Sequence, residues 1–191
     1  MSSGTCLLSS ATVDTSIGRI KLSACPQGLH LIELTITKEC ELETGCDDGR
    51  VLVLEFPRQE NLESQDHIHK GIKWLTKYFS GNMECTHEVP TLCFSNLPDF
   101  TTRVYKQLLQ TRPGDTLTYS ELSQRTIGSS KAARAVGNAM KRNPFILVVP
   151  CHRVVPSLTR HNKSCNPFGK YACGSSLKER LINFERNAFT S

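Results

Sequence analysis

The sequence predicts a two-domain protein, with a small α/β domain first and a mainly helical domain second. Two observations lead to this prediction. Short segments typical of strands fall within the first hundred residues, whereas apolar residues at helical spacing dominate after them. A stretch with prolines and little periodicity separates the two regions. We place the domains at residues 1–92 and 100–191, with a linker at 93–99.

The first domain is expected to begin with three strands. Residues 10–13 and 19–25 are typical of two strands around a turn that contains Gly18. Residues 29–37 predict a third strand, because apolar and polar residues alternate over most of its length. These segments together predict a small sheet.

A loop, a short segment and a helix complete this domain. Residues 38–50 are polar and acidic and contain glycine, so a loop is expected. Residues 51–56 are either another short strand or the start of a loop. A helix is expected over 66–79, where an apolar stripe recurs at helical spacing, and Gly81 follows as a stop signal.

The second domain is expected to open and close with helices. The first starts near Phe100 and ends before Pro113-Gly114. The last starts near Ser176 and carries apolar residues on one face, and Glu185 falls on that same face. A carboxylate there must be paired or hydrogen-bonded. A frayed, exposed helix end is the alternative.

Two short helices are expected between them, at 118–125 and 129–142, with Gly128 in the turn and Ser129 as the N-cap. This is the helix-turn-helix pattern, whose second helix enters a groove of DNA. The second helix has a buried apolar stripe, a basic stripe and very small residues between them. Such small residues suit a helix pressed against a nucleic acid backbone, although an ordinary packed helix pair is the alternative.

The charge distribution favours a polyanionic partner. Residues 1–100 carry 8 basic and 14 acidic side chains, a net charge of −6, whereas residues 101–191 carry 15 and 4, a net charge of +11. This asymmetry favours nucleic acid, and a solvated basic surface is the alternative. No apolar run is long enough to span a bilayer, and the first residues lack a signal-peptide pattern, so no membrane partner is expected.

The motif with the most specific chemistry is Pro150-Cys151-His152-Arg153-Val154. It follows the apolar run 145–149, which predicts a buried strand. A rigidly held cysteine beside a basic neighbour can form a reactive thiolate. A buried structural cysteine is the alternative. The chain has nine cysteines without regular spacing, which argues against a disulfide framework and for reduced thiols in the cytosol or nucleus.

This combination of helix-turn-helix, strand and Cys-His motif resembles the O6-alkylguanine-DNA alkyltransferases, a family of direct-reversal DNA repair proteins. The resemblance is strong over residues 100–185 and weaker before them. The matching stretches are Lys131 to Gly137, Asn143-Pro144, Pro150 to Val154 and the final helix. The resemblance implies a first domain shaped like ribonuclease H. It also implies irreversible, single-turnover transfer of the alkyl group from O6-methylguanine or O4-methylthymine in duplex DNA, with base flipping.

The resemblance further implies roles for individual residues. Cys151 is the expected nucleophile, His152 its base acting through a water, and Glu185 the group that orients His152. Tyr119 is expected to donate a hydrogen bond to the ring of the leaving guanine. Asn143 is expected to connect the recognition helix with the active-site strand.

The resemblance implies DNA contacts by a set of mostly small or polar residues: Thr101, Tyr119, Ser120, Ser129, Lys131, Ala132, Ala133, Arg134, Gly137 and Ser157. Among them, Arg134 resembles the arginine finger that fills the gap left by a flipped nucleotide. The implied pocket is lined by Met140, Val154, Tyr171 and Ala172.

Several positions depart from the family pattern. The loop 156–170 is long, Ala172 and Cys173 stand where serine and glycine are usual, and Ile146 replaces a proline of the pocket. We expect these changes to alter the reaction with large alkyl groups.

A structural zinc ion in the first domain is also implied, because vertebrate-type relatives carry one. Cys6, Cys25 and His30 match three ligand positions, and Cys93 is the nearest candidate for the fourth. Free thiols are the alternative, since the spacing is not that of a zinc finger.

Two other classes of function stay open at this stage. A non-catalytic reader of alkylated guanine would bind the same DNA without needing Cys151, His152 and Glu185. A cysteine hydrolase would not need Arg134 or a recognition helix with small residues. The favoured expectation is a monomer without an organic cofactor that binds duplex DNA, cooperatively or not, in the nucleus or also in the cytoplasm.

Overall fold

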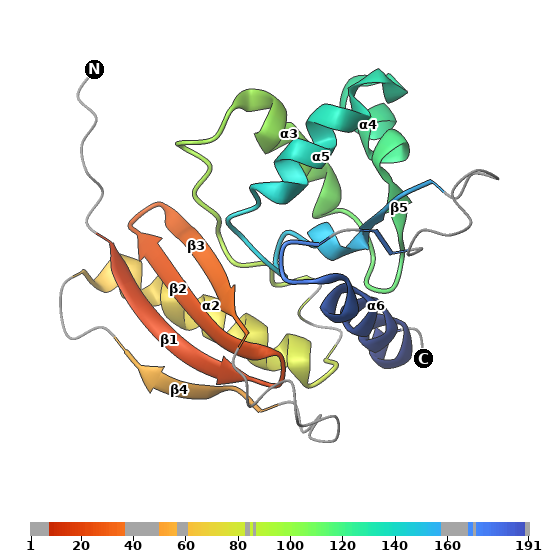
Figure 1. Cartoon of the computed structure of the whole chain (residues 1–191). Coiled ribbons are helices and arrows are strands. Elements are labelled where there is room, and N and C mark those ends of the chain that lie inside the picture. The colour runs from red at the N-terminus through yellow and green to blue at the C-terminus, as the bar shows by residue number, and fades with distance from the viewer. Residues whose placement is uncertain are drawn as a thin grey trace, which may run out of the picture. The chain divides into compact units, whose positions relative to one another are not determined.

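The computed structural model separates the chain into two units, residues 1–95 and 96–191 (Figure 1). It describes residues 8–36, 50–56, 61–82, 85, 87–157, 168–169 and 171–189. The first unit combines an antiparallel sheet with a helix and the second is mainly helical, as predicted. None of the described helices is long and apolar enough to cross a membrane.

The sheet of the first unit has four antiparallel strands in the order β3-β2-β1-β4. The strands are β1 (Ser9–Thr15), β2 (Gly18–Cys25), β3 (Gly28–Thr35) and β4 (Leu52–Glu55). Gly18 begins β2 with a φ of 129°, a conformation that side-chain-bearing residues rarely adopt, so the predicted turn has its glycine where the backbone requires it. Of the two alternatives for residues 51–56, the strand is confirmed.

Helix α2 (Leu62–Phe79) covers one face of this sheet (Figure 1). It begins four residues before the predicted start, because Asn61 caps it by accepting a hydrogen bond from the Ser64 backbone N–H at 3.0 Å. A Cβ on Gly71 would lie 2.8 Å from a methyl group of Leu22. The absence of a side chain there lets the helix approach the sheet closely.

The segment after α2 returns to the sheet at its β3 edge. Leu29 and Leu92 form a parallel bridge, and the Cys93 N–H donates to the Leu29 carbonyl at 2.8 Å. These bonds join Cys93 to the sheet of the first unit.

The second unit is built mainly from helices. Its elements are α3 (Asp99–Leu108), β5 (Leu117–Thr118), α4 (Tyr119–Ile127), the 3-10 helix η2 (Ser130–Ala132), α5 (Ala133–Lys141), the 3-10 helix η3 (Cys151–Arg153), β6 (Val154–Val155) and α6 (Ser175–Phe189). The two short strands β5 and β6 pair in parallel.

Helices α4 and α5 are defined by their caps. Thr118 and Glu121 form a capping box at the start of α4, and Gly128 ends it with a φ of 70°. Ser129 accepts a hydrogen bond from the Lys131 N–H, so it caps η2, and α5 follows. The predicted helix over 129–142 therefore begins with a 3-10 turn.

The prediction of a strand at residues 145–149 is wrong. This segment forms consecutive turns, in which the Val149 N–H donates to the Phe145 carbonyl at 2.8 Å and Leu147 has a φ of 70°. All five side chains are buried, as predicted. A short apolar run indicates burial but does not by itself distinguish a strand from other buried structure.

Candidate active site

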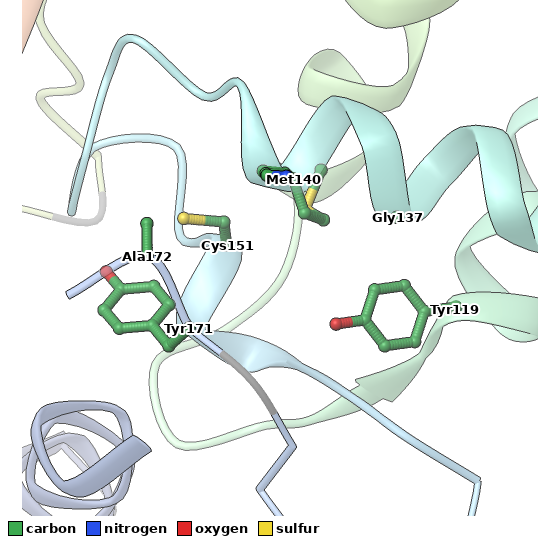
Figure 2. Close-up of a pocket in the computed structure, with 7 residues that line it drawn as sticks. Tyr119, Gly137, Met140, Cys151, Tyr171 and Ala172 are labelled. Atoms are coloured by element: carbon green, nitrogen blue, oxygen red, sulfur yellow. The ribbon is translucent and has the colours of Figure 1, made fainter. Parts of the chain in front are cut away.

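Cys151 lies at the edge of a cavity in the second unit. The cavity has a volume of about 370 Å³ and is lined by Tyr119, Gly137, Met140, Lys141, Cys151, Tyr171 and Ala172. In Figure 2, Cys151 lies toward the side of Tyr171 and Ala172, whereas Tyr119 lies at the opposite side with its hydroxyl directed into the space between them. The Cys151 sulfur and the Tyr119 phenol thus face one pocket from different elements.

The Cys151 thiol is almost fully buried, with 7% of the residue exposed. Burial raises the pKa of this thiol, because a thiolate is poorly solvated there. Hydrogen bonds from Asn143 and Tyr171 and the charge of Lys178 oppose this effect without overcoming it. The resting residue is therefore a thiol, and a nucleophilic thiolate requires a group that removes its proton.

Asn143 connects the end of α5 to the cysteine. Its Nδ2 donates to the Val149 carbonyl at 2.8 Å and to Cys151 Sγ at 3.1 Å, and its Oδ1 accepts from the Phe145 N–H at 3.0 Å. One side chain therefore holds both ends of the turn segment and also donates to the sulfur.

His152 and Glu185 form a buried pair behind Cys151. His152 Nε2 lies 2.8 Å from Glu185 Oε1, and neither side chain is exposed. Burial alone would raise the pKa of Glu185, but the contacts with His152 and Arg153 outweigh it and hold that pKa far below its usual range. The expectation that Glu185 would be paired rather than frayed is confirmed.

The other ring nitrogen of His152, Nδ1, differs from Nε2 in its surroundings. Nδ1 is buried and has no partner among the residues that the structure describes. A buried polar atom of this kind is usually satisfied by an ordered water. A water bound at Nδ1 is what the predicted relay between His152 and Cys151 requires.

Two charged residues of the site were missed as functional residues from the sequence. Arg153 is buried and donates to both carboxylate oxygens of Glu185 at 2.9 Å. Lys178 is 1% exposed, and its Nζ donates to the Val154 carbonyl at 2.6 Å. The sequence does indicate that Lys178 is buried. It stands seven residues before Glu185 and so lies on the same face of the last helix.

Lys178 should support the reactivity of Cys151. Burial lowers the pKa of Lys178 to about 8, while Cys151 acts in the opposite direction. Below that pH the ammonium charge of Lys178 favours the thiolate. Lys178→Met should therefore slow the alkylation of Cys151 by iodoacetamide roughly threefold to tenfold, which is up to about 1.4 kcal/mol of activation free energy. The difference should shrink above about pH 8, where the native lysine itself becomes neutral. Peptide mass spectrometry measures the rate, and Lys21→Met, an exposed lysine of β2, serves as the control.

The predicted DNA contacts lie on accessible parts of the second unit. Ser120, Lys131, Arg134 and Ser157 are exposed. The other members of this set, Thr101, Tyr119, Ser129, Ala132, Ala133 and Gly137, are partly exposed. Most of them belong to α4, η2 and α5.

The predicted pocket is only partly the observed one. Met140, Tyr171 and Ala172 line the cavity, and Lys141 was missed. Among the described residues, Val154, Ile146 and Cys173 are not part of the lining. Val154 instead presents its backbone carbonyl to Lys178. Most of the long loop 156–170 lies outside the described residues.

Three of the predicted metal ligands meet in the first unit. The ligand atoms of Cys25, His30 and Cys93 lie within 4.8 Å of one another. His30 Nε2 is buried without a hydrogen-bond partner among the described residues. Two sulfurs and a ring nitrogen are a suitable donor set for tetrahedral zinc. Cys6 lies outside the described residues.

The fold and the site define a class of protein in which a buried cysteine borders a cavity within a basic, mainly helical unit. Comparison with known proteins is consistent with this class. The model of the family "6-O-methylguanine DNA methyltransferase, DNA binding domain" matches residues 99–187. The methylated-DNA–protein-cysteine methyltransferase of Homo sapiens is 31% identical over 185 residues, which are 94% of this chain and 81% of the human protein. That of Metallosphaera sedula is 31% identical over 73% of this chain and 82% of its own length. The chain belongs to the methylated-DNA–protein-cysteine methyltransferase family.

A solved structure matches residues of both units. The Mycobacterium tuberculosis OGT structure in complex with DNA covers 94% of this chain and 93% of its own, with a TM-score of 0.66 and 25% identity.

Proposed function

We propose that this protein repairs alkylated DNA by transferring the alkyl group from the O6 atom of guanine to Cys151. The observation that carries the proposal is the buried Cys151 thiol, which lines a pocket that faces Tyr119 and has the His152–Glu185 pair behind it. The family to which the chain belongs supports the same activity. Transfer from O4-methylthymine is proposed as a second reaction of the same site.

In the proposed reaction, His152 Nδ1 takes the thiol proton through a water, and Cys151 Sγ attacks the alkyl carbon. The sulfur–carbon bond forms as the carbon–O6 bond breaks, and the bonding electrons pass to guanine. Burial raises the pKa of Tyr119, which keeps its hydroxyl protonated and able to donate to the leaving base. The guanine anion takes up one proton in place of the alkyl group, and the proton that His152 removed from the thiol balances this uptake overall.

The resulting thioether is stable toward water, so each molecule acts once. None of the described site residues offers a route that returns Cys151 to a thiol. Single turnover is therefore part of the proposal.

We propose that α4, Gly128, η2 and α5 act as a helix-turn-helix that binds duplex DNA. The exposed Arg134 and Lys131 and the small residues of the same surface support this assignment. Base flipping follows from burial of Cys151, because its sulfur could not reach a guanine that is stacked within the duplex. Arg134 would then occupy the vacated position. Localisation in the nucleus and a monomeric state stay predictions.

The test is mass spectrometry of the intact protein and its peptides after mixing with duplex DNA that contains one O6-methylguanine. One added methyl group on the Cys151 peptide, ending at one equivalent and absent in Cys151→Ser, is expected. Tight binding without a mass change would instead indicate a non-catalytic reader. Turnover of a chromogenic ester at Cys151 would indicate a hydrolase.

We also propose that Cys25, His30 and Cys93 hold a structural zinc ion, with Cys6 as the fourth ligand. When bound, zinc would join the β2–β3 turn to the segment after α2, which should stabilise the first unit. One zinc per chain is expected by elemental analysis, and Cys93→Ser should lose most of it. Cys85→Ser, which removes a buried cysteine outside this cluster, should retain the metal. Zinc-free protein that keeps the same melting temperature would contradict the proposal.

A further inference from the structure

We propose that Arg153 is a positioning residue that determines which nitrogen of His152 accepts the proton of Cys151. This inference rests on the proposed function, because it concerns how the base is prepared. It starts from a contact pattern that the reaction itself does not require. His152 and Glu185 would suffice for a proton relay, yet Arg153 also donates hydrogen bonds to the Glu185 carboxylate.

The guanidinium of Arg153 is held on both sides. Its Nε and Nη2 donate to the two oxygens of Glu185, each at 2.9 Å. Its Nη1 donates to the backbone carbonyl of Thr111 at 2.6 Å and to the Thr111 hydroxyl at 3.0 Å. This forked geometry fixes both the orientation and the charge of Glu185.

Glu185 therefore behaves only as an acceptor. Besides Arg153, it accepts a hydrogen bond from the Gly114 N–H at 2.9 Å. A carboxylate surrounded by such donors has no hydrogen to give. The nitrogen that faces it, His152 Nε2 at 2.8 Å, must then carry the ring hydrogen. Nδ1 then carries no hydrogen and keeps a free lone pair, and it has no hydrogen-bond partner among the described residues.

Arg153 also balances the charge of the cluster. With the arginine present, the buried negative charge of Glu185 is already paired. If the arginine is removed, His152 is the group among the contacts described above that can become positively charged, and it balances Glu185 by taking a second hydrogen at Nδ1. Nδ1 would then no longer accept a proton from Cys151.

The test is nitrogen-15 NMR of histidine side chains in the full-length protein at neutral pH, with His152 assigned from His152→Gln. We expect Nδ1 to resonate as an unprotonated nitrogen in the native protein and in Arg153→Lys, and as a protonated nitrogen in Arg153→Met. Adding Glu185→Gln to Arg153→Met should return Nδ1 to the unprotonated position. Arg112→Met, which removes an exposed arginine beside Thr111, should change nothing.

An Nδ1 that stays unprotonated in folded Arg153→Met, or one that is protonated in the native protein, would overturn the proposal. The spectrum of the native protein shows whether Nδ1 carries a hydrogen, even if Arg153→Met does not fold. The outcomes are separable from those of the proposed function. Native protein that accepts a methyl group but carries a hydrogen on Nδ1 refutes only the role of Arg153.

Discussion

The free energy of unfolding of the second unit should fall by about 3–5 kcal/mol when Glu185 is replaced by glutamine, because the change leaves the buried charge of Arg153 without its partner. Arg153 is 7% exposed and Glu185 is fully buried, so water cannot compensate. Denaturant titration followed by circular dichroism measures the change. Glu179→Gln, on the exposed face of the same helix, should alter stability by less than about 0.5 kcal/mol.

The fluorescence of the single tryptophan, Trp74, offers an internal control, because this residue belongs to helix α2 of the first unit. Its transition should move less than the circular dichroism signal. Equal stability of Glu185→Gln and the native protein would mean that the buried network contributes nothing to folding.

The same substitution predicts a pH dependence. The folded-state pKa of Glu185 is lowered, so the unfolded chain binds its proton at a higher pH than the folded chain does. The stability that this carboxylate contributes is complete above its unfolded pKa of about 4.3 and is lost as the pH falls below that value. The difference between native protein and Glu185→Gln should therefore be largest near neutral pH and should shrink in acid.

The reactivity of Cys151 should fall at least about tenfold in Asn143→Asp, which corresponds to about one pKa unit of the thiol. The aspartate keeps an oxygen for the Phe145 N–H but replaces the donor that lies 3.1 Å from Cys151 Sγ with a negative charge. A neighbouring like charge disfavours the thiolate and raises the thiol pKa further.

The rate of iodoacetamide labelling of Cys151 as a function of pH measures this effect, and methyl transfer from DNA should fall in parallel. Asn138→Asp, an exposed position on α5, is the matched control. If labelling of Asn143→Asp follows the native pH profile, Asn143 only shapes the turn segment and does not act on the sulfur.

Much of the fold was predictable because local patterns determine it. The two strand-like segments at 10–13 and 19–25 and the glycine between them predict neighbouring strands around a turn, and the structure pairs Val13 with Ile20 in a hairpin. The helical stripe of α2 and the capping residues around Gly128 predict helices in the right places. The run at residues 145–149 was misread because burial leaves the same apolar signature on turns and on strands.

The sequence by itself determined the two-domain order, the basic second half and the Cys-His motif, since these depend on residue type and on spacing along the chain. Only the tertiary structure decided that Arg153 and Gly114 also donate hydrogen bonds to Glu185 and that Lys178 donates one to the Val154 carbonyl. It also decided that Cys93 meets Cys25 and His30. These contacts join residues from 24 to 71 positions apart, so no local pattern records them. Their physical cause is burial: once the helices pack, each enclosed charge must find a partner, and packing determines which one is within reach.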